Sequence, residues 1–381
     1  MELKGFNQAA FLRDYWQKKP LLIPNSWSDW RNPLTPEELA GLACEETVES
    51  RLIVGGDDAP SVEHGPIVTE RYDTLGTRDW TLLVQAVDHH VPAVAALLEP
   101  FRFVPDWRID DVMVSFAANG GGVGAHFDQY DVFLVQGAGK RRWQVGGMCN
   151  ENTKLSPHGD LRLLADFTPT EEWVLEAGDM LYIPPGIAHN GIAVGEDCMT
   201  YSIGFRAPSR SDLIGGWMED LIGEMVEDDR YSDPDLHEQN NPGEIAPEAI
   251  ERLHAMVTER LNDKAEFANW FGRYSSTAKY PEVDWQPDVP MMAAEFAAEF
   301  TAGVTLLRNP ASRFAYIEQE AGAVQLFVQG EDYLCDGGVA EFARLLCGTS
   351  AIDPTPEMVA SEPVAELVLQ LLNTGSLAIQ A

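Results

Sequence analysis

The most informative stretch of the sequence is Glu176-Ala-Gly-Asp-Met-Leu-Tyr-Ile-Pro-Pro-Gly-Ile-Ala-His-Asn190. Its Gly-Asp pair predicts a turn, residues 180–183 predict a buried strand, and Pro-Pro-Gly predicts a second, rigid turn. His189 then stands at the start of a further strand. Because the turns fix the backbone, this layout delivers an imidazole from a rigid hairpin on a barrel wall.

A second stretch, Asn119-Gly-Gly-Gly-Val-Gly-Ala-His-Phe-Asp128, supplies two more side chains of the metal-ligand type. His126 and Asp128 are one residue apart on an expected strand, so their side chains point to the same face. Two histidines and one carboxylate form the triad that binds Fe(II) and leaves open positions. We therefore expect His126, Asp128 and His189 to be metal ligands; the alternative is a set of buried, hydrogen-bonded side chains.

The glycines before His126 raise a second interpretation, a loop that binds phosphate. Such a loop needs a helix after its glycines, because the helix N-terminus points at the anion. Here an alternating, strand-like run follows, and there is no Gly-Lys-Ser/Thr motif. We therefore expect the glycines to permit a tight backbone entry beside a ligand.

The pattern of apolar residues along the sequence changes near residue 208. Short apolar or alternating runs fill residues 50–207 and predict a sandwich or barrel, after helices at 6–16 and 35–43 and a strand at 21–23. The strands expected in the barrel lie at 112–116, 132–135, 141–145, 173–175, 180–183 and 199–205.

The second part of the chain begins with helical patterns. Apolar residues recur at helical spacing over 213–226 and 250–261, and these faces must dock on the barrel or pair with another subunit. Residues 280–290 hold three prolines and are expected to be a linker. The elements expected beyond it resemble a winged helix, with helices at 291–300, 339–346 and 364–372 and strands at 314–318, 324–328 and 333–335.

The charge of the chain limits its partners. Sixty-one acidic residues against 26 basic ones give a net charge of −35, which repels phosphate backbones and anionic membrane surfaces. Residues 281–381 contain three bases and fifteen acids, so we expect no direct nucleic-acid binding by the tail. The charge favours a basic protein partner, and adaptation to salt or to solubility is the alternative.

Cysteine usage and hydropathy bear on the compartment. The five cysteines are scattered without a Cys-x-x-Cys pair, which argues against a disulfide framework or a zinc knuckle and fits a reducing cytoplasm. The chain shows no apolar leader at its start and no uninterrupted apolar run of about 18 residues. We expect a cytoplasmic protein that does not span a membrane.

The combination of His126-Phe-Asp128 with Gly178-Asp179 through His189 resembles the JmjC branch of the 2-oxoglutarate- and Fe(II)-dependent oxygenases. Residues 11–23, 106–111 and 201–208 are in turn similar to the bacterial ribosomal oxygenases. The resemblance implies an all-β double-stranded β-helix (cupin/JmjC jelly roll) core with flanking helices. It also implies a JmjC catalytic domain at 1–208, a helical dimerisation domain at 209–280 that makes a homodimer, and a winged-helix-like domain at 281–381.

The other parts of the site follow from the chemistry of 2-oxoglutarate. Its far carboxylate needs a cation inside the barrel, and alternation makes Arg141 the inward candidate, at the position of the family's basic residue. Inward hydroxyls expected to complete the cosubstrate pocket are Ser115, Thr200 and Ser202, with a hydrogen bond inside the core as the alternative for each. Asp111 is expected to meet a substrate arginine and Tyr130 to line the entrance, with a surface aspartate and core packing as the respective alternatives. The remaining histidines are expected to be surface or satisfied groups: His64, His89, His90, His158, His237 and His254.

These features together predict an enzyme that uses Fe(II), 2-oxoglutarate and O₂. By resemblance it hydroxylates the β-carbon of an arginine in large-subunit ribosomal protein L-sixteen, a basic substrate. One alternative is a JmjC demethylase of a methylated basic protein, which would release formaldehyde. Two others belong to different classes: a metal-free cupin that serves as a binding scaffold, and a winged-helix nucleic-acid binder.

Overall fold

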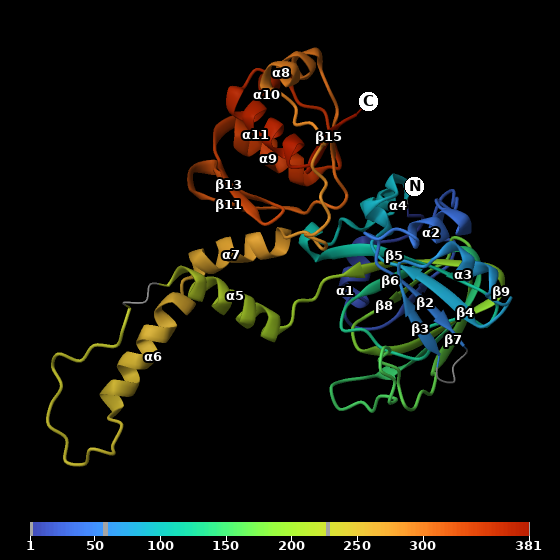
Figure 1. Ribbon diagram of the computed structural model, residues 1–381, viewed down its shortest axis with the longest axis horizontal. Coiled ribbons are helices and arrows are strands. Elements are labelled where there is room, and N and C mark those ends of the chain that lie inside the picture. Colours follow the sequence, from blue (N-terminus) through green and yellow to red (C-terminus); the bar gives the residue numbers. More distant parts are fainter. Residues whose placement is uncertain (1–2, 56–59, 226–228, 381) are drawn as a thin grey trace. The chain divides into compact units, whose positions relative to one another are not determined.

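The computed structural model describes residues 3–55, 60–225 and 229–380 (Figure 1). These residues form two compact units, Met1–Ala207 and Pro208–Ala381, and each is described by itself. In the described part of the chain, no helix combines the length and the apolar character that a bilayer crossing requires.

The first unit is built on one large antiparallel sheet that curls into a barrel. Its strands follow the order β1-β8-β6-β9-β5-β4-β2-β3, and β7 pairs with β6 outside that path. The strands are β1 (Leu21–Ile23), β2 (Ser50–Val54), β3 (Ser61–His64), β4 (Trp80–Val84), β5 (Ile109–Ala117), β6 (Val132–Met148), β7 (Glu171–Glu176), β8 (Met180–Ile183) and β9 (Ile187–Phe205).

Two long paired strands, β6 and β9, lie in the middle of this sheet, and here the sequence-based prediction of separate short strands is wrong. Residues 132–135 and 141–145 both lie in β6, and β9 runs without a break from 187 to 205. The β6–β9 register shifts between Gln136 and Lys140, where Gly139 has a φ of 58°. The glycines therefore make bulges that bend a continuous strand, and they do not end it.

A helical layer covers the outer face of the barrel. It contains α1 (Gln8–Asp14), α2 (Pro36–Leu42), α3 (Thr69–Asp73), α4 (Pro92–Ala95) and the 3₁₀ turns η1 (Val87–His89), η2 (Ala96–Phe101) and η3 (Asp106–Arg108). The predicted start of α2 is confirmed, because Thr35 and Glu38 form a capping box with Pro36 in the first turn. Phe11 and Phe101 pack against Phe133 of β6 and so join this layer to the sheet.

The two faces of the sheet have different roles. The outer face carries the larger core, in which Val112, Val114 and Tyr201 pack under the helical layer. The inner face carries a smaller apolar cluster that includes Leu134 and Trp143. Strand alternation sends every second side chain of β5, β6 and β9 to the inner face, and this is the face that holds the candidate site.

The second unit begins with three helices, α5 (Arg210–Glu224), α6 (Pro247–Leu261) and α7 (Lys264–Ser276). The sequence analysis expected α5 and α6 but not α7; Val226, at the end of the first expected helix, lies outside the described residues. Trp217 and Trp270 join α5 to α7, with ring centroids 5.5 Å apart. Gly272 lets α7 lie directly on Phe327, since a Cβ there would stand 2.3 Å from the ring.

The rest of the second unit confirms the expected helix and strand pattern. Its elements are α8 (Ala293–Ala302), β10 (Leu306–Arg308), β11 (Phe314–Glu318), η4 (Glu320–Gly322), β12 (Val324–Val328), β13 (Glu331–Cys335), α9 (Gly337–Gly348), β14 (Ala351–Ile352), α10 (Pro356–Val359), α11 (Glu362–Asn373) and β15 (Leu377–Ile379). Strands β11-β12-β13 form the expected antiparallel sheet, and β14-β10-β15 form a second small sheet that the sequence analysis missed. Residues 280–290 contain no helix or strand, as the prolines predict.

Candidate active site

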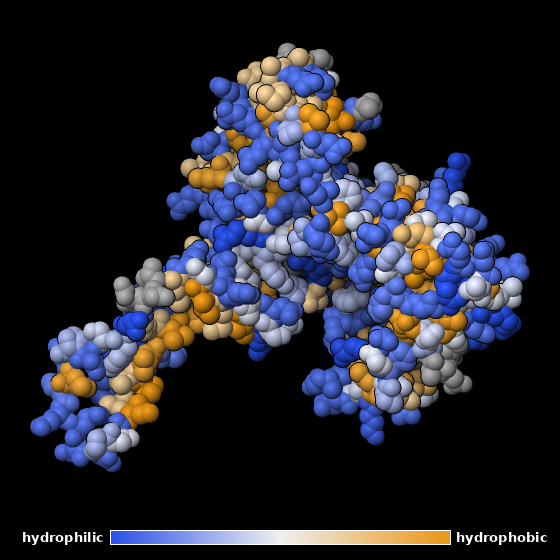
Figure 2. Space-filling model, in the orientation of Figure 1, coloured by the Kyte–Doolittle hydropathy of each residue, from blue (hydrophilic) through white to orange (hydrophobic). Residues whose placement is uncertain are grey.

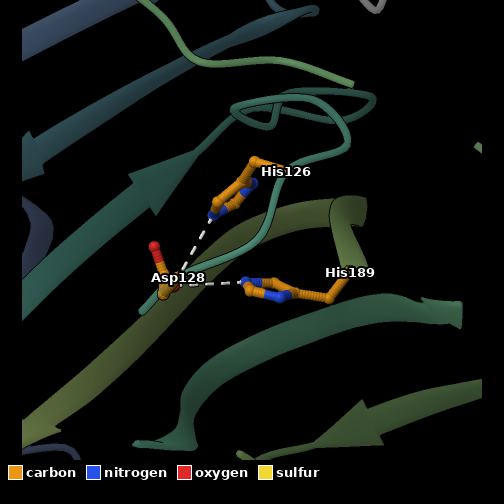
Figure 3. A group of neighbouring side chains, drawn as sticks. All are labelled: His126, Asp128 and His189. Atoms are coloured by element: carbon orange, nitrogen blue, oxygen red, sulfur yellow. Dashed lines mark ion pairs between the residues drawn. The ribbon is translucent and has the colours of Figure 1, made fainter. Parts of the chain in front are cut away.

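Three side chains from two segments of the barrel converge on one point (Figure 3). Their ligand atoms, one each from His126, Asp128 and His189, all lie within 4.8 Å of one another. Asp128 Oδ2 is 3.6 Å from His189 Nε2 and 3.9 Å from His126 Nε2. Among the described residues, this is the one group of His, Cys, Asp and Glu side chains with such geometry.

Backbone carbonyls orient both imidazoles. His126 Nδ1 lies 2.9 Å from the carbonyl oxygen of Gly124, and His189 Nδ1 lies 3.0 Å from that of Ile187. Because a carbonyl can only accept, each Nδ1 carries the hydrogen and each Nε2 presents a lone pair. Two nitrogen lone pairs and a carboxylate oxygen thus face one another, and this donor set fits a divalent iron-type cation.

The surroundings of His189 keep its imidazole neutral. His189 is 2 % exposed, and this burial, together with the nearby His126, lowers the pKa of His189 below its ordinary value of 6.5. The ring therefore stays neutral near pH 7, as coordination through Nε2 requires.

The backbone around His126 and Asp128 differs from the expected strand. His126 makes a single antiparallel bridge to His189, with N···O distances of 3.0 and 2.8 Å, and residues 127–131 belong to no strand. Beyond this bridge the carbonyl of Asp128 accepts a hydrogen bond, 2.7 Å long, from the amide of Gly186 in the Pro-Pro-Gly turn just before β9. The strand prediction is wrong, yet the side chains still converge.

The glycine run allows the close approach that the sequence analysis expected. A Cβ on Gly121 would lie 2.1 Å from the Trp80 carbonyl oxygen, and one on Gly122 would lie 2.4 Å from the Gly191 carbonyl oxygen. Since neither backbone can yield that much, a larger residue would displace the segment from β4 or β9. No helix follows the run, so the phosphate-loop interpretation fails.

Arg141 lies on the inner face of β6 and is 4 % exposed. Its Nη2 donates to Ser115 Oγ at 3.3 Å and its Nη1 donates to the Gly191 carbonyl at 3.4 Å, both long bonds. The buried Nε has no hydrogen-bond partner, and among the described residues no carboxylate lies within ion-pair distance. A buried guanidinium with spare donors fits the far carboxylate of a keto diacid.

Arg141 and the triad are neighbours inside the barrel. The ring of Trp143 lies 5.9 Å from the ring of His189 and 5.7 Å from the guanidinium carbon of Arg141. Gly191 makes room for this indole, because a Cβ there would stand 2.6 Å from the Trp143 ring. His189 of the triad and the cationic side chain of Arg141 therefore lie on either side of one indole.

The three expected hydroxyl residues all lie on buried positions of β5 and β9. Ser115 pairs with Thr200 across the sheet and Ser202 pairs with Met113, and all three are less than a tenth exposed. Thr200 Oγ1 donates to Gln136 Oε1 at 3.1 Å, so it is hydrogen-bonded within the core. The sequence analysis missed the fully buried Gln136; its position two residues after Leu134 on an alternating strand was the available signal.

Asp111 and Tyr130 lie near the triad on the carboxylate-rich side. Tyr130 is 42 % exposed, but desolvation of its hydroxyl and the charges of Asp128, Asp111 and Asp110 raise its pKa. Asp111 is buried, and its Oδ2 accepts bonds from the Gln85 side chain at 2.8 Å and from a backbone amide at 2.9 Å. It is therefore not the loop or surface aspartate of the alternative interpretation.

The other histidines do not join a metal-ligand group among the described residues. His64, His237 and His254 are exposed. His158 is satisfied by backbone groups, because its Nε2 lies 2.7 Å from the Pro60 carbonyl oxygen and its Nδ1 accepts from two amides.

Comparison with known families agrees with this barrel and this site. Residues 96–213 match the JmjC domain, and residues 259–378 match the ROXA-like winged helix. The barrel is thus a JmjC domain of cupin type, and the C-terminal part of the chain is a winged helix of the ROXA-like kind.

Two individual relatives show to which family of JmjC proteins this chain belongs. The chain is 43% identical over 288 residues to the ribosomal protein uL16 3-hydroxylase of Escherichia coli, covering 74% of this chain and 76% of that protein. It is 36% identical over 282 residues to a probable ribosomal oxygenase of Haemophilus influenzae, covering 70% and 67% respectively. The protein belongs to the JmjC ribosomal oxygenase family.

Solved structures are similar to this protein over its full length. The E. coli protein YcfD superposes with a TM-score of 0.90 at 35% sequence identity, covering 100% of both chains. YcfD in complex with cobalt and 2-oxoglutarate superposes with a TM-score of 0.88, covering 100% of this chain and 99% of that one.

Proposed function

We propose that this protein is a 2-oxoglutarate- and Fe(II)-dependent hydroxylase that modifies the β-carbon of an arginine in ribosomal protein uL16. The observation that carries the proposal is the adjacency of the triad and Arg141, linked by the Trp143 indole on one inner face. One relative in E. coli is named a ribosomal protein uL16 3-hydroxylase, and the similar E. coli ribosomal oxygenase YcfD has been solved in complex with cobalt and 2-oxoglutarate.

The residues of the site have separate roles. His126, Asp128 and His189 hold Fe(II), with the two Nε2 lone pairs and one carboxylate oxygen as ligands. Arg141 pairs with the far carboxylate of 2-oxoglutarate, and Ser115 is within reach of the same guanidinium. Bound iron, 2-oxoglutarate and O₂ supply the oxidising chemistry that inserts oxygen into an unactivated C–H bond, with succinate and CO₂ as coproducts.

The protein contributes positioning and exclusion of water. The neutral, buried His189 and the indole of Trp143 keep the cosubstrate side apolar apart from Arg141 and the hydroxyls of Thr200 and Ser202. The guanidinium of Arg141 in these surroundings selects a ligand whose carboxylate reaches Arg141 while its other end binds the metal.

The substrate side suits a guanidinium. Asp111, Asp110 and Asp128 all act on the hydroxyl of Tyr130, so their negative potential gathers at one place beside the metal ligands. We assign Asp111 to substrate binding and Tyr130 to the wall of the entrance. The net charge of −35 attracts a basic ribosomal protein over a longer range.

A homodimer through residues 209–280 is part of the proposal. Helix α5 exposes Ile214 and Ile222, Met225 follows directly after its end, and α6 exposes Ile250 and Val257; each of these residues is 48 to 65 % exposed in the single chain. Figure 2 shows these apolar residues as an orange strip along the two helices. A second copy that covers this strip would remove these apolar side chains from water, and a two-fold interface would pair the same strip on both copies.

A product assay tests the function. The full-length protein is incubated with Fe(II), ascorbate, 2-oxoglutarate and a uL16 peptide that contains the arginine, and the peptide is sequenced by tandem mass spectrometry. We expect one added oxygen atom on arginine, located on the β-carbon by nuclear magnetic resonance, and no product with His126→Ala. Formaldehyde release from a methylated peptide would instead support the demethylase, and an unmodified peptide with metal-free protein would support the scaffold.

The remaining assignments concern organisation and compartment. We place the catalytic domain at 1–208, the dimerisation domain at 209–280 and the winged-helix domain at 281–381. A cytoplasmic location accompanies a ribosomal substrate, and fractionation of cells that express a tagged full-length chain checks it.

A further inference from the structure

A hairpin between β6 and β7 stands next to the metal-ligand segment. Its arms pair through an antiparallel bridge between Leu155 and Leu164, and the amide of Ser156 donates to the Leu163 carbonyl at 2.8 Å. We refer to residues 154–165 as the 154–165 hairpin. None of its side chains belongs to the triad, so the function assigned above gives it no role.

The 154–165 hairpin makes a backbone contact with the edge of the His126 segment that does not face β9. The amide of Leu164 donates to the Ala125 carbonyl at 2.8 Å, while the opposite edge of the segment is bonded to His189. His126 is outside any regular strand and has a single bridge to β9. Its backbone is therefore held from both sides, by β9 on one edge and by the hairpin on the other.

Leu163 supplies the packing that accompanies this contact. Gly124 has a φ of 99°, and Leu163 packs against the side of Gly124 where a Cβ would stand. Such a Cβ would lie 3.1 Å from Leu163 Cδ2 and 3.4 Å from Leu163 Cδ1. The same Gly124 offers the carbonyl that orients the His126 ring. Leu163 is 7 % exposed and packs in one cluster with Leu161 and Ile53.

His158 fastens the turn of the hairpin. Its Nδ1 accepts from the amides of Asp160 at 3.2 Å and Leu161 at 3.1 Å, so this nitrogen has no hydrogen. Nε2 must then carry the hydrogen, and it donates to the Pro60 carbonyl at 2.7 Å. One neutral imidazole thus ties the hairpin to the segment before β3.

We propose that the 154–165 hairpin is a positioning device for the metal ligand His126, in which Leu163 sets the segment and His158 fixes the hairpin. This inference rests on the proposed function, because it assumes that the triad binds a metal. Neither residue touches the metal, so both act through the Gly124 carbonyl and the backbone of residues 124–126. Loss of groups that orient a ligand typically weakens metal binding by about 10–100-fold.

Co(II) binding by the full-length protein, measured by calorimetry under anaerobic conditions, tests the inference. We expect Leu163→Ala to weaken Co(II) binding about tenfold and to alter the visible absorption of the bound ion. Leu163→Met should restore affinity to within about threefold, since methionine fills a similar volume. Leu155→Ala is the matched control, because this leucine of the same hairpin is 37 % exposed and does not face Gly124.

A second variant protects the test against misfolding. His158→Ala removes the tie without opening a cavity at Gly124, and it should weaken Co(II) binding and speed amide exchange of residues 119–128 in the metal-free protein. Unchanged Co(II) affinity in folded Leu163→Ala and His158→Ala would overturn the positioning role while the hydroxylase assignment stands. Failure of the wild-type protein to bind Co(II) would overturn both.

Discussion

At the residue scale, the proposed cosubstrate site depends on Arg141, the one buried arginine or lysine among the residues that the structure describes. Arg141→Ala should weaken 2-oxoglutarate binding by about 30-fold or more, since loss of one partner of a buried charged pair costs about 2–5 kcal/mol. Calorimetry with the Mn(II)-loaded protein measures this. Arg142→Ala is the control, because Arg142 lies on the opposite face of β6. Equal losses in the two variants would exclude Arg141 as the carboxylate partner.

A second prediction at this scale concerns His189 and pH. Its folded-state pKa lies below 6.5, so in the metal-free protein the unfolded chain takes up a proton that the folded chain does not. This contribution to stability is present above pH 6.5 and is lost as the pH falls below it. Urea unfolding of His189→Gln should therefore depend less steeply on pH between 6.5 and 5, by up to about 1.4 kcal/mol per pH unit. Parallel wild-type and variant curves would show that His189 does not titrate this way.

Individual site residues were predictable where alternation and chemistry agreed. Arg141 was placed inward because Trp143 and Val145 share its face, and the structure buries all three. The fully buried Gln136 was missed because a polar residue at the end of an apolar run was read as the end of the strand. Its partner in the core, Thr200, lies 64 residues further along the chain, a distance that no local pattern reveals.

At the element scale, the contact between α7 and the winged-helix sheet yields a stability prediction. A Cβ on Gly272 would stand 2.3 Å from the Phe327 ring, so Gly272→Ala should lower the free energy of unfolding by about 1–3 kcal/mol. Gly41→Ala, in the exposed face of α2 with nothing within 4 Å, should be neutral or stabilising by up to about 1 kcal/mol. Urea unfolding of both variants checks this; a neutral Gly272→Ala would mean that α7 does not pack as described.

Elements were predictable where a strong local signal existed. The capping box of α2 and the apolar run of β8 gave their bounds closely. The prediction divided β6 because Gly137 and Gly139 are ordinarily turn residues, and only pairing with β9 makes them bulges. Helix α7 was missed because its Trp and Phe residues are buried only by contacts with α5, which is distant in the sequence.

At the scale of the whole molecule, the exposed faces of α5 and α6 predict self-association. The double variant Ile222→Asp, Val257→Asp should shift the protein from dimer to monomer, since two buried charges would cost several kcal/mol in an apolar interface. Analytical ultracentrifugation at micromolar concentration measures the shift. Leu334→Asp, at a residue 73 % exposed on β13, is the control and should remain dimeric. A monomeric wild-type protein would contradict the dimer.

The most direct test of the central claim is a crystal structure of the full-length protein with Co(II) and 2-oxoglutarate. We expect one anomalous-scattering peak bonded to His126 Nε2, Asp128 and His189 Nε2, with the far carboxylate of 2-oxoglutarate paired to Arg141. A peak bonded to other residues, or 2-oxoglutarate bound away from Arg141, would contradict it.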